Sequence, residues 1–124
     1  MRRVTLGALT VLIALSVGGC GGATHSSYAS VETLRADALR AGLVCPTWTR
    51  DDRADGTQAG SCSATTRLFV YPNGGALGAA MDQLHDISDS TGLPFAVLVG
   101  ENWVVNDANA ALLQKELGGE LVTD

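Results

Sequence analysis

A histidine and three aspartates lie together in a stretch of the chain with a helical pattern. Asp82 precedes His85 by three residues, and Asp89 follows it by four. Residues three or four apart share one face of a helix, so these side chains should gather on one exposed face, with Asp86 nearby. The cluster could serve as an acid-base or metal site. A metal site needs further ligands from other segments, so we favour a solvated polar face.

A second acidic stretch is faintly similar to a calcium-binding loop. Asp51 and Asp55 are followed by Gly56. However, Arg53 occupies a middle ligand position, and Cys62 stands where a bidentate glutamate should close the loop. We therefore expect a solvated hairpin tip here and no metal.

Motifs that would indicate catalysis are missing from the sequence. There is no Gly-x-Ser-x-Gly, phosphate-binding loop or His-Glu-x-x-His sequence. Ser61 and Ser63 have no histidine close in sequence that could activate them. We expect no catalytic residue and no cofactor, and so predict that the protein is not an enzyme.

The N-terminus has the pattern of an export signal. Arg2 and Arg3 precede an apolar run from Val4 to Val17, which is too short for a comfortable transmembrane helix of about 20 residues. Val17-Gly18-Gly19-Cys20 then resembles the bacterial lipobox, in which the cysteine thiol receives a diacylglyceryl group before cleavage. The resemblance implies a signal peptide over residues 1–19, cleavage between Gly19 and Cys20, and a lipid anchor on Cys20. The alternative is an ordinary signal peptide with a chance cysteine.

Two cysteines remain once Cys20 is assigned to lipid. Cys45 and Cys62 form an even pair, which outside the cytoplasm normally oxidises. Their disulfide would close a loop of about 18 residues, worth roughly 3 kcal/mol. A metal or redox pair is the alternative, but neither a Cys-x-x-Cys spacing nor a nearby histidine supports it.

Charge and composition limit the partners. Without Arg2 and Arg3, six basic residues remain against thirteen acidic ones, for a net charge near −7. Such a domain should not bind nucleic acid or rely on anionic lipid. Seven of the eight basic residues are arginine, and alanine and glycine are abundant. Together with the lipobox, this bias resembles small actinobacterial lipoproteins of uncharacterised function, which implies a location on the outer face of the cell membrane.

Beyond the signal, the chain divides into a short tether and one domain. Residues 20–29 are small and polar around His25, which suits a flexible tether. Residues 30–124 fit a single α+β domain with the order α-β-β-α-β-β-α, one antiparallel sheet of about four strands, helices on one face and one disulfide. The predicted helices run from a Ser30 cap to Gly42, over residues 76–89, and from a cap at Asn106 or Asp107 to Gly118; the predicted strands are 43–49, 62–71, 95–99 and 103–105.

The last two strands allow two arrangements. Gly100-Glu101-Asn102 can form a tight turn in which glycine supplies a positive φ, giving a hairpin with Trp103-Val104-Val105. The alternative is one long bulged strand. We favour the hairpin.

Two tryptophans and one charged loop are the candidate contact residues. Trp48 and Trp103 should pack in or at the rim of the core, although an exposed tryptophan near Arg50 and Arg53 would mark a binding surface. The loop over residues 50–60 is braced by the disulfide and carries mixed charges, so a protein partner in the cell envelope could contact Arg50, Asp51, Asp52, Arg53 and Asp55 there.

Three functions fit this sequence. The first is a membrane-anchored, non-catalytic interaction or accessory module, which an intact small fold without catalytic groups favours. The second is a small hydrolase or ligand-binding lipoprotein with its site around His85. The third is an inhibitor of a secreted enzyme that inserts the loop over residues 50–60. A pocket beside His85 would favour the second, and a flat tryptophan-arginine patch would favour the first.

Overall fold

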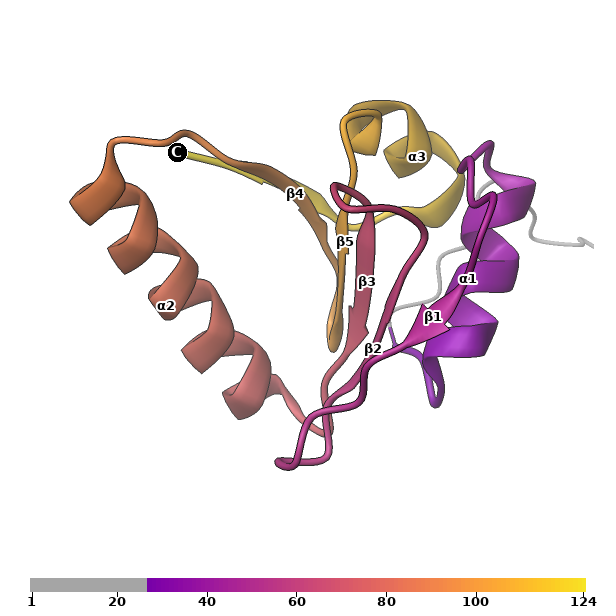
Figure 1. Cartoon of the computed structure of the whole chain (residues 1–124), viewed down its shortest axis with the longest axis horizontal. Helices are drawn as coiled ribbons and strands as arrows, with labels where there is room; N and C mark the ends of the chain where they lie inside the picture. The colour runs from indigo at the N-terminus through magenta and orange to yellow at the C-terminus, as the bar shows by residue number, and fades with distance from the viewer. Residues whose placement is uncertain (1–26) are drawn as a thin grey trace, which may run out of the picture.

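The computed structural model describes residues 27–124, which form a six-stranded antiparallel sheet and three helices (Figure 1). The strands lie in the order β1-β2-β3-β5-β4-β6. The signal peptide, Gly19, Cys20 and His25 lie outside the described residues. The elements along the chain are α1 (Val31–Arg40), β1 (Thr49–Arg50), β2 (Gln58–Ser61), β3 (Arg67–Val70), α2 (Gly74–Thr91), β4 (Ala96–Val99), β5 (Trp103–Asn106), α3 (Ala110–Leu117) and β6 (Glu120–Thr123).

The prediction of one antiparallel sheet with three helices is confirmed, but its strand count and order were wrong. The segment expected as one strand over residues 62–71 turns at Ser63, whose hydroxyl accepts the N–H groups of Thr65 and Thr66. Two strands, β2 and β3, therefore pair across that turn. The strand expected over residues 43–49 is reduced to β1, and β6 pairs with the outer edge of β4. The observed order is α-β-β-β-α-β-β-α-β.

The helix ends follow the capping residues of the sequence. The Ser30 hydroxyl accepts the N–H of Thr33 at 3.2 Å, and Gly42 follows α1 with a φ of +110°. Asn73 caps α2 by accepting the N–H of Ala76 at 2.8 Å, and Gly92 ends it with a φ of +69°. Helix α2 is therefore longer at both ends than expected. Helix α3 is shorter and begins only at Ala110, because Asn106 still belongs to β5.

The helices lie on both faces of the sheet, which corrects the expectation of a single covered face. Figure 1 shows α1 and α3 on one side of the strands and α2 on the other. Alternate residues of a strand point to opposite faces, and here both sets are apolar. The main core under α1 and α3 holds Leu34, Leu68, Leu98, Trp103, Val105, Leu113 and Leu117, whereas Leu77 of α2 meets Val97 and Val104 on the other face. No described helix is long and apolar enough to cross a membrane.

Trp103 fills the main core and determines which residues can surround it. It is fully buried, with the ring of Tyr28 edge-on at 5.8 Å. A Cβ added at Gly100 would lie 1.9 Å from the indole, and one at Gly119 would lie 3.1 Å from it. The β4–β5 hairpin is confirmed, and its register pairs Val99 with Val104. Gly100 is not among the glycines with positive φ, so its role is to leave room for the indole and not to permit the turn.

Substituting Gly100 by alanine should destabilise the domain by about 1–3 kcal/mol, since the added methyl overlaps the indole and forces the core apart. The matched control is Gly78→Ala in α2, where a Cβ would meet nothing within 4 Å. That change should stabilise by up to about 1 kcal/mol through helix propensity. Denaturant unfolding measures both values, and equal midpoints for the two variants would contradict the packing described.

The predicted disulfide between Cys45 and Cys62 is confirmed. It ties the segment before β1 to the end of β2, where Thr49 lies opposite Ser61. The Thr47 hydroxyl also donates to the carbonyl of Cys62 at 3.2 Å. The cross-link therefore holds an edge of the sheet where β1 itself is only two residues long.

Replacing both Cys45 and Cys62 by serine should lower the free energy of unfolding by roughly 3 kcal/mol, because the unfolded chain regains the freedom of the closed loop. Thermal unfolding before and after reduction of the unsubstituted protein is the matching measurement. A midpoint that reduction leaves unchanged would show that the cross-link contributes nothing.

Candidate functional site

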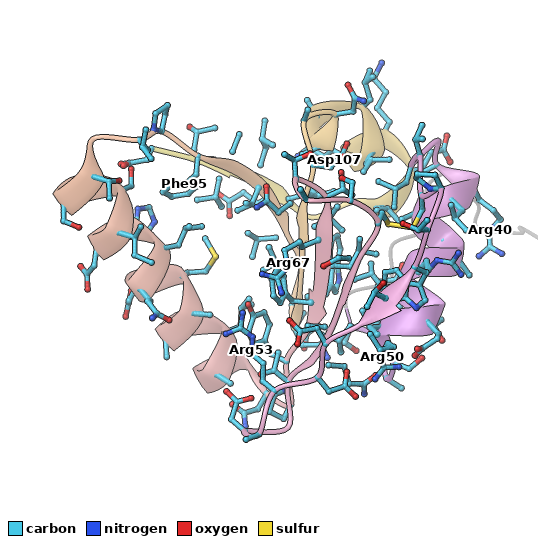
Figure 2. All side chains as sticks on the ribbon, in the orientation of Figure 1. Arg40, Arg50, Arg53, Arg67, Phe95 and Asp107 are labelled. Carbon is cyan, nitrogen blue, oxygen red and sulfur yellow. A yellow bond between two sulfur atoms is a disulfide. The ribbon has the colours of Figure 1, made fainter. Side chains whose placement is uncertain are left out.

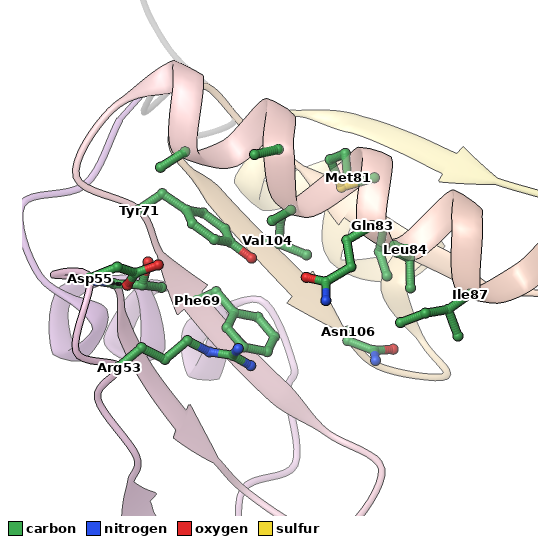
Figure 3. Close-up of a pocket in the computed structure, with 15 residues that line it drawn as sticks. Arg53, Asp55, Phe69, Tyr71, Met81, Gln83, Leu84, Ile87, Val104 and Asn106 are labelled. Atoms are coloured by element: carbon green, nitrogen blue, oxygen red, sulfur yellow. Dashed lines mark hydrogen bonds between the residues drawn. The ribbon is translucent and has the colours of Figure 1, made fainter.

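The structure contains a groove between α2 and the face of the sheet opposite the main core. Its volume is about 340 Å³, within the usual range for small-ligand sites. Figure 3 shows α2 along one side and Phe69, Tyr71 and Arg53 along the other. The lining consists of Arg53, Asp55, Thr57, Phe69, Tyr71, Ala76, Ala79, Ala80, Met81, Gln83, Leu84, Ile87, Val97, Val104 and Asn106.

The groove exists because α2 is held near its two ends and carries small residues between them. Near its start, Leu77 is buried against Val97 and Val104. Near its end, the Ser88 hydroxyl donates to the Leu93 carbonyl at 2.6 Å and also contacts the Asp124 carboxylate. Three of the four residues that line the groove from the first half of the helix are alanines, Ala76, Ala79 and Ala80, and the fourth is Met81. The alanine methyl groups are too short to fill the space to the sheet.

The floor of the groove is aromatic and is lined by Arg53, whereas Arg67 lies over the same phenylalanine without lining the groove. Phe69 and Tyr71 stack with ring centroids 6.1 Å apart. The guanidinium carbons of Arg53 and Arg67 lie 5.5 and 5.2 Å from the centroid of Phe69, within cation–π distance. Two positive groups are thus held on one ring beside an apolar wall.

The two arginines differ in how their charges are balanced. Arg67 pairs with the Asp51 carboxylate at 3.0 Å, while its Nε is buried without a hydrogen-bond partner. Within residues 27–124, no carboxylate lies within ion-pair distance of Arg53. Asp55 is close: its carboxylate accepts the Thr57 N–H at 2.9 Å, and this bond, together with the charge of Arg53, lowers the pKa of Asp55. The groove lining therefore contains one guanidinium without an ion pair, Arg53, and one carboxylate, Asp55.

The charged loop predicted to contact a partner is divided between the two faces. Arg50 makes a bidentate pair with Asp52, at 2.6 and 2.7 Å, and also contacts Glu32 of α1. The bonds to Asp52 and Glu32 raise the pKa of Arg50, and the bond from Arg50 lowers the pKa of Asp52. Figure 2 shows Arg50 on the α1 side, and Arg53 and Arg67 on the α2 side. Only Arg53 and Asp55 of the predicted loop residues line the groove.

The loop is also shorter than expected, because Thr49–Arg50 and Gln58–Ser61 belong to β1 and β2. Its tip closes through the Arg53 N–H, which donates to the Thr57 carbonyl at 2.9 Å. Its three carboxylates are engaged separately, by Arg67, by Arg50 and by the backbone of Thr57. Across residues 27–124, no three histidine, cysteine or acidic side chains are arranged to hold a metal ion.

The two tryptophans have different environments. Trp103 is fully buried, so it belongs to the core and offers no surface to a partner. Trp48 is half-buried on the α1 side, where its ring covers Gly60 and the Arg35 guanidinium lies 5.1 Å from its centroid. The structure therefore brings neither tryptophan to the groove.

The cluster on α2 is not a converging site. The His85 ring packs edge-on against Phe95, with centroids 5.0 Å apart, and is half-buried there. Asp82, Asp86 and Asp89 are exposed. The groove lies on the same helix but includes Gln83, Leu84 and Ile87 in its lining, and not His85.

The first described residues are joined to one end of the groove. The backbone of Tyr28 exchanges two hydrogen bonds with the Asn102 side chain, at 2.8 and 2.9 Å. The Asn102 carbonyl accepts the Tyr71 N–H at 2.7 Å. Tyr28, at the start of the described residues, is thus linked through Asn102 to Tyr71, a residue of the groove.

Comparison with protein-family models, with curated proteins and with solved structures finds no match to this chain.

Sequence reasoning missed most of the groove. Phe69 and Tyr71 fell within the strand predicted over residues 62–71, and the alanines of α2 fell within the helix predicted over residues 76–89; neither prediction indicated a groove. The sequence does contain one indication of the groove: Phe69, Val97 and Val104 are apolar residues on the second face of the strands. Another element must pack on that face to cover them. An alanine- and glycine-rich helix is a poor cover for it.

Both tyrosines of the chain should titrate above the ordinary value of about 10. Burial raises the pKa of Tyr28 and of Tyr71, although Arg40 and Arg53 respectively oppose this. Because the folded state holds these protons more tightly than the unfolded chain, the associated stability is present below pH 10 and is lost as the pH rises through the folded pKa values. Tyrosinate absorbance against pH measures this, and a tyrosine ionising below 10 in the folded protein would contradict it.

Proposed function

We propose that this chain is an extracytoplasmic lipoprotein, anchored through Cys20, that works as a non-catalytic binding module and uses the α2 groove as its binding site. The groove is the observation that carries the proposal. It is concave, largely apolar and supplied with a few polar groups, which is the usual composition of a small-molecule site. The lipobox-like sequence supports the anchor and the location.

The chemistry of the lining favours binding over hydrolysis. Hydrolysis by a side-chain nucleophile needs a serine, cysteine or threonine within reach of a base. Histidine, serine and cysteine are absent from the lining, and its threonine, Thr57, has only the backbone-engaged Asp55 close by. The inhibitor alternative has less support, because the charges of the braced loop are largely satisfied within the domain.

Blocking the groove should remove whatever the protein carries. Ala79 is exposed and lines the groove, so Ala79→Phe should fill the space without disturbing the core. Ala36→Phe, on the exposed side of α1, is the matched control. Mass spectrometry of small molecules that co-purify with the natively exported protein should show a compound retained by the unsubstituted chain and by Ala36→Phe, and lost from Ala79→Phe. Identical profiles for all three proteins would rule out a groove-based binding function.

The anchor is tested separately by acylation. Cys20→Ser should abolish incorporation of labelled fatty acid, because the thiol that forms the thioether is gone. Cys62→Ser keeps that thiol and should still be labelled, even though it loses the disulfide. Label remaining on Cys20→Ser would refute the lipoprotein assignment.

A further inference from the structure

We infer that the α2 groove binds a single-chain amphiphile with an anionic head group, drawn from the membrane beside the anchor. The inference rests on the proposed function, because it names the ligand class of the same groove. It assigns the acyl chain to the apolar side of the groove and the head group to Arg53, which lies on Phe69.

The apolar side of the groove suits one flexible chain. Met81, Leu84 and Ile87 line it from α2, and Val97 and Val104 line it from the sheet. Ile87 is half exposed although it faces this space. Covering such side chains is favourable by about 25 cal/mol per Å² of apolar surface removed from water. The volume of about 340 Å³ lies at the lower end of the range for ligand sites, which favours one chain over two.

The polar side of the groove presents hydrogen-bond donors without matching acceptors. Arg53 lines this side and has no carboxylate within ion-pair distance among the described residues. Figure 3 shows the Gln83 side-chain amide extending from α2 into the groove, and the Asn106 side chain on the sheet side of the groove. A carboxylate or phosphate offers several acceptors at once and forms charge-assisted bonds with guanidinium groups.

The other charged residues of the chain indicate that the positive charge of Arg53 acts only on a ligand within the groove. The exported domain is acidic overall, so it would not attract anions at long range. Arg40, Arg50 and Arg67 each pair with a carboxylate. Among the described residues Arg35, Arg53 and Lys115 have no such pair, and of these three Arg53 alone lines the apolar groove, beside Asp55. That combination of an unpaired cation and an apolar wall matches an anionic amphiphile better than a neutral apolar ligand.

The attachment point places the groove within reach of the bilayer. Tyr28 is bonded to Asn102, which is bonded to Tyr71 in the groove. Tyr28 is eight positions after Cys20, and a fully extended chain of that length spans at most about 28 Å. A ligand leaving the outer leaflet would therefore have a short distance to cover.

The test compares two photoreactive amphiphiles that differ only in the head group. The lipidated protein is reconstituted in phosphatidylcholine vesicles, and each probe carries the same diazirine-bearing twelve-carbon chain. One probe ends in a carboxylate, and the other ends in a trimethylammonium group. Cross-links are mapped by peptide mass spectrometry. We expect the carboxylate probe to label peptides from α2 and β3 at least tenfold more than the trimethylammonium probe at equal membrane concentration, with unlabelled dodecanoate competing.

Two substitutions assign the head group to Arg53. Arg53→Gln should reduce carboxylate labelling about tenfold, which corresponds to about 1.4 kcal/mol, and leave trimethylammonium labelling unchanged. Lys115→Gln removes an exposed cation from α3 on the other face and should change neither. Unchanged carboxylate labelling in Arg53→Gln would overturn the inference.

The groove-filled variant separates failure of this inference from failure of the proposed function. Ala79→Phe should abolish labelling of both helix and strand peptides. If both probes label the unsubstituted protein equally and Ala79→Phe abolishes that labelling, the anionic ligand class is overturned and the binding function stands. Labelling that survives Ala79→Phe, together with unchanged co-purification profiles, would overturn both.

Discussion

The packing of Trp103 between the sheet and helices α1 and α3 is the constraint on which the rest of the domain depends. The indole is fully buried on β5, a central strand, and its surface comes so close to the chain at Gly100 and Gly119 that a side chain at Gly100 would overlap it. The first glycine belongs to the β4–β5 connection, and the second lies between α3 and β6. One side chain thereby fixes where the hairpin closes and where the chain returns from α3 to the sheet edge. Tyr28, edge-on to the same ring, brings the start of the domain to this point.

The two faces of the sheet are covered unequally, and this inequality produces the groove. On the α1 and α3 side, leucines and Trp103 interlock in a continuous core. On the other side, α2 offers one buried leucine, Leu77, and a series of alanines, so the helix lies against the sheet only where larger side chains or end contacts hold it. A protein stabilised mainly by one face can leave the other open for a ligand. The disulfide between Cys45 and Cys62 and the Trp48–Gly60 contact both strengthen the side that holds no groove.

The sequence predicted the features that depend on local chemistry. Ser30, Gly42 and Gly118 mark helix ends through capping, and the even cysteine pair gave the disulfide. It failed where tertiary packing decides. Residues 58–61 read as loop because Gly60 is a turn former, yet glycine is needed there to accept the Trp48 ring on a strand. Strand β6 is a four-residue segment that forms because it pairs with the edge of β4 and packs Leu121 and Val122 on the two faces of the sheet. The groove could not be predicted because it depends on the distance between α2 and the sheet. The hydrophobic periodicity of the sequence does not determine that distance.

The division of the charged loop explains why its residues cannot act as one surface. Arg50 bonds to Asp52 and to Glu32 of α1, whereas Arg53 and Asp55 lie toward the groove and Asp51 pairs with Arg67. Exposed ion pairs of this kind contribute little stability individually, so their main effect is to fix the path of the loop. Arg50 is held on the α1 side, and three residues later Arg53 lies over Phe69 on the α2 side. The loop therefore presents its charges on two faces of the sheet and not as one surface.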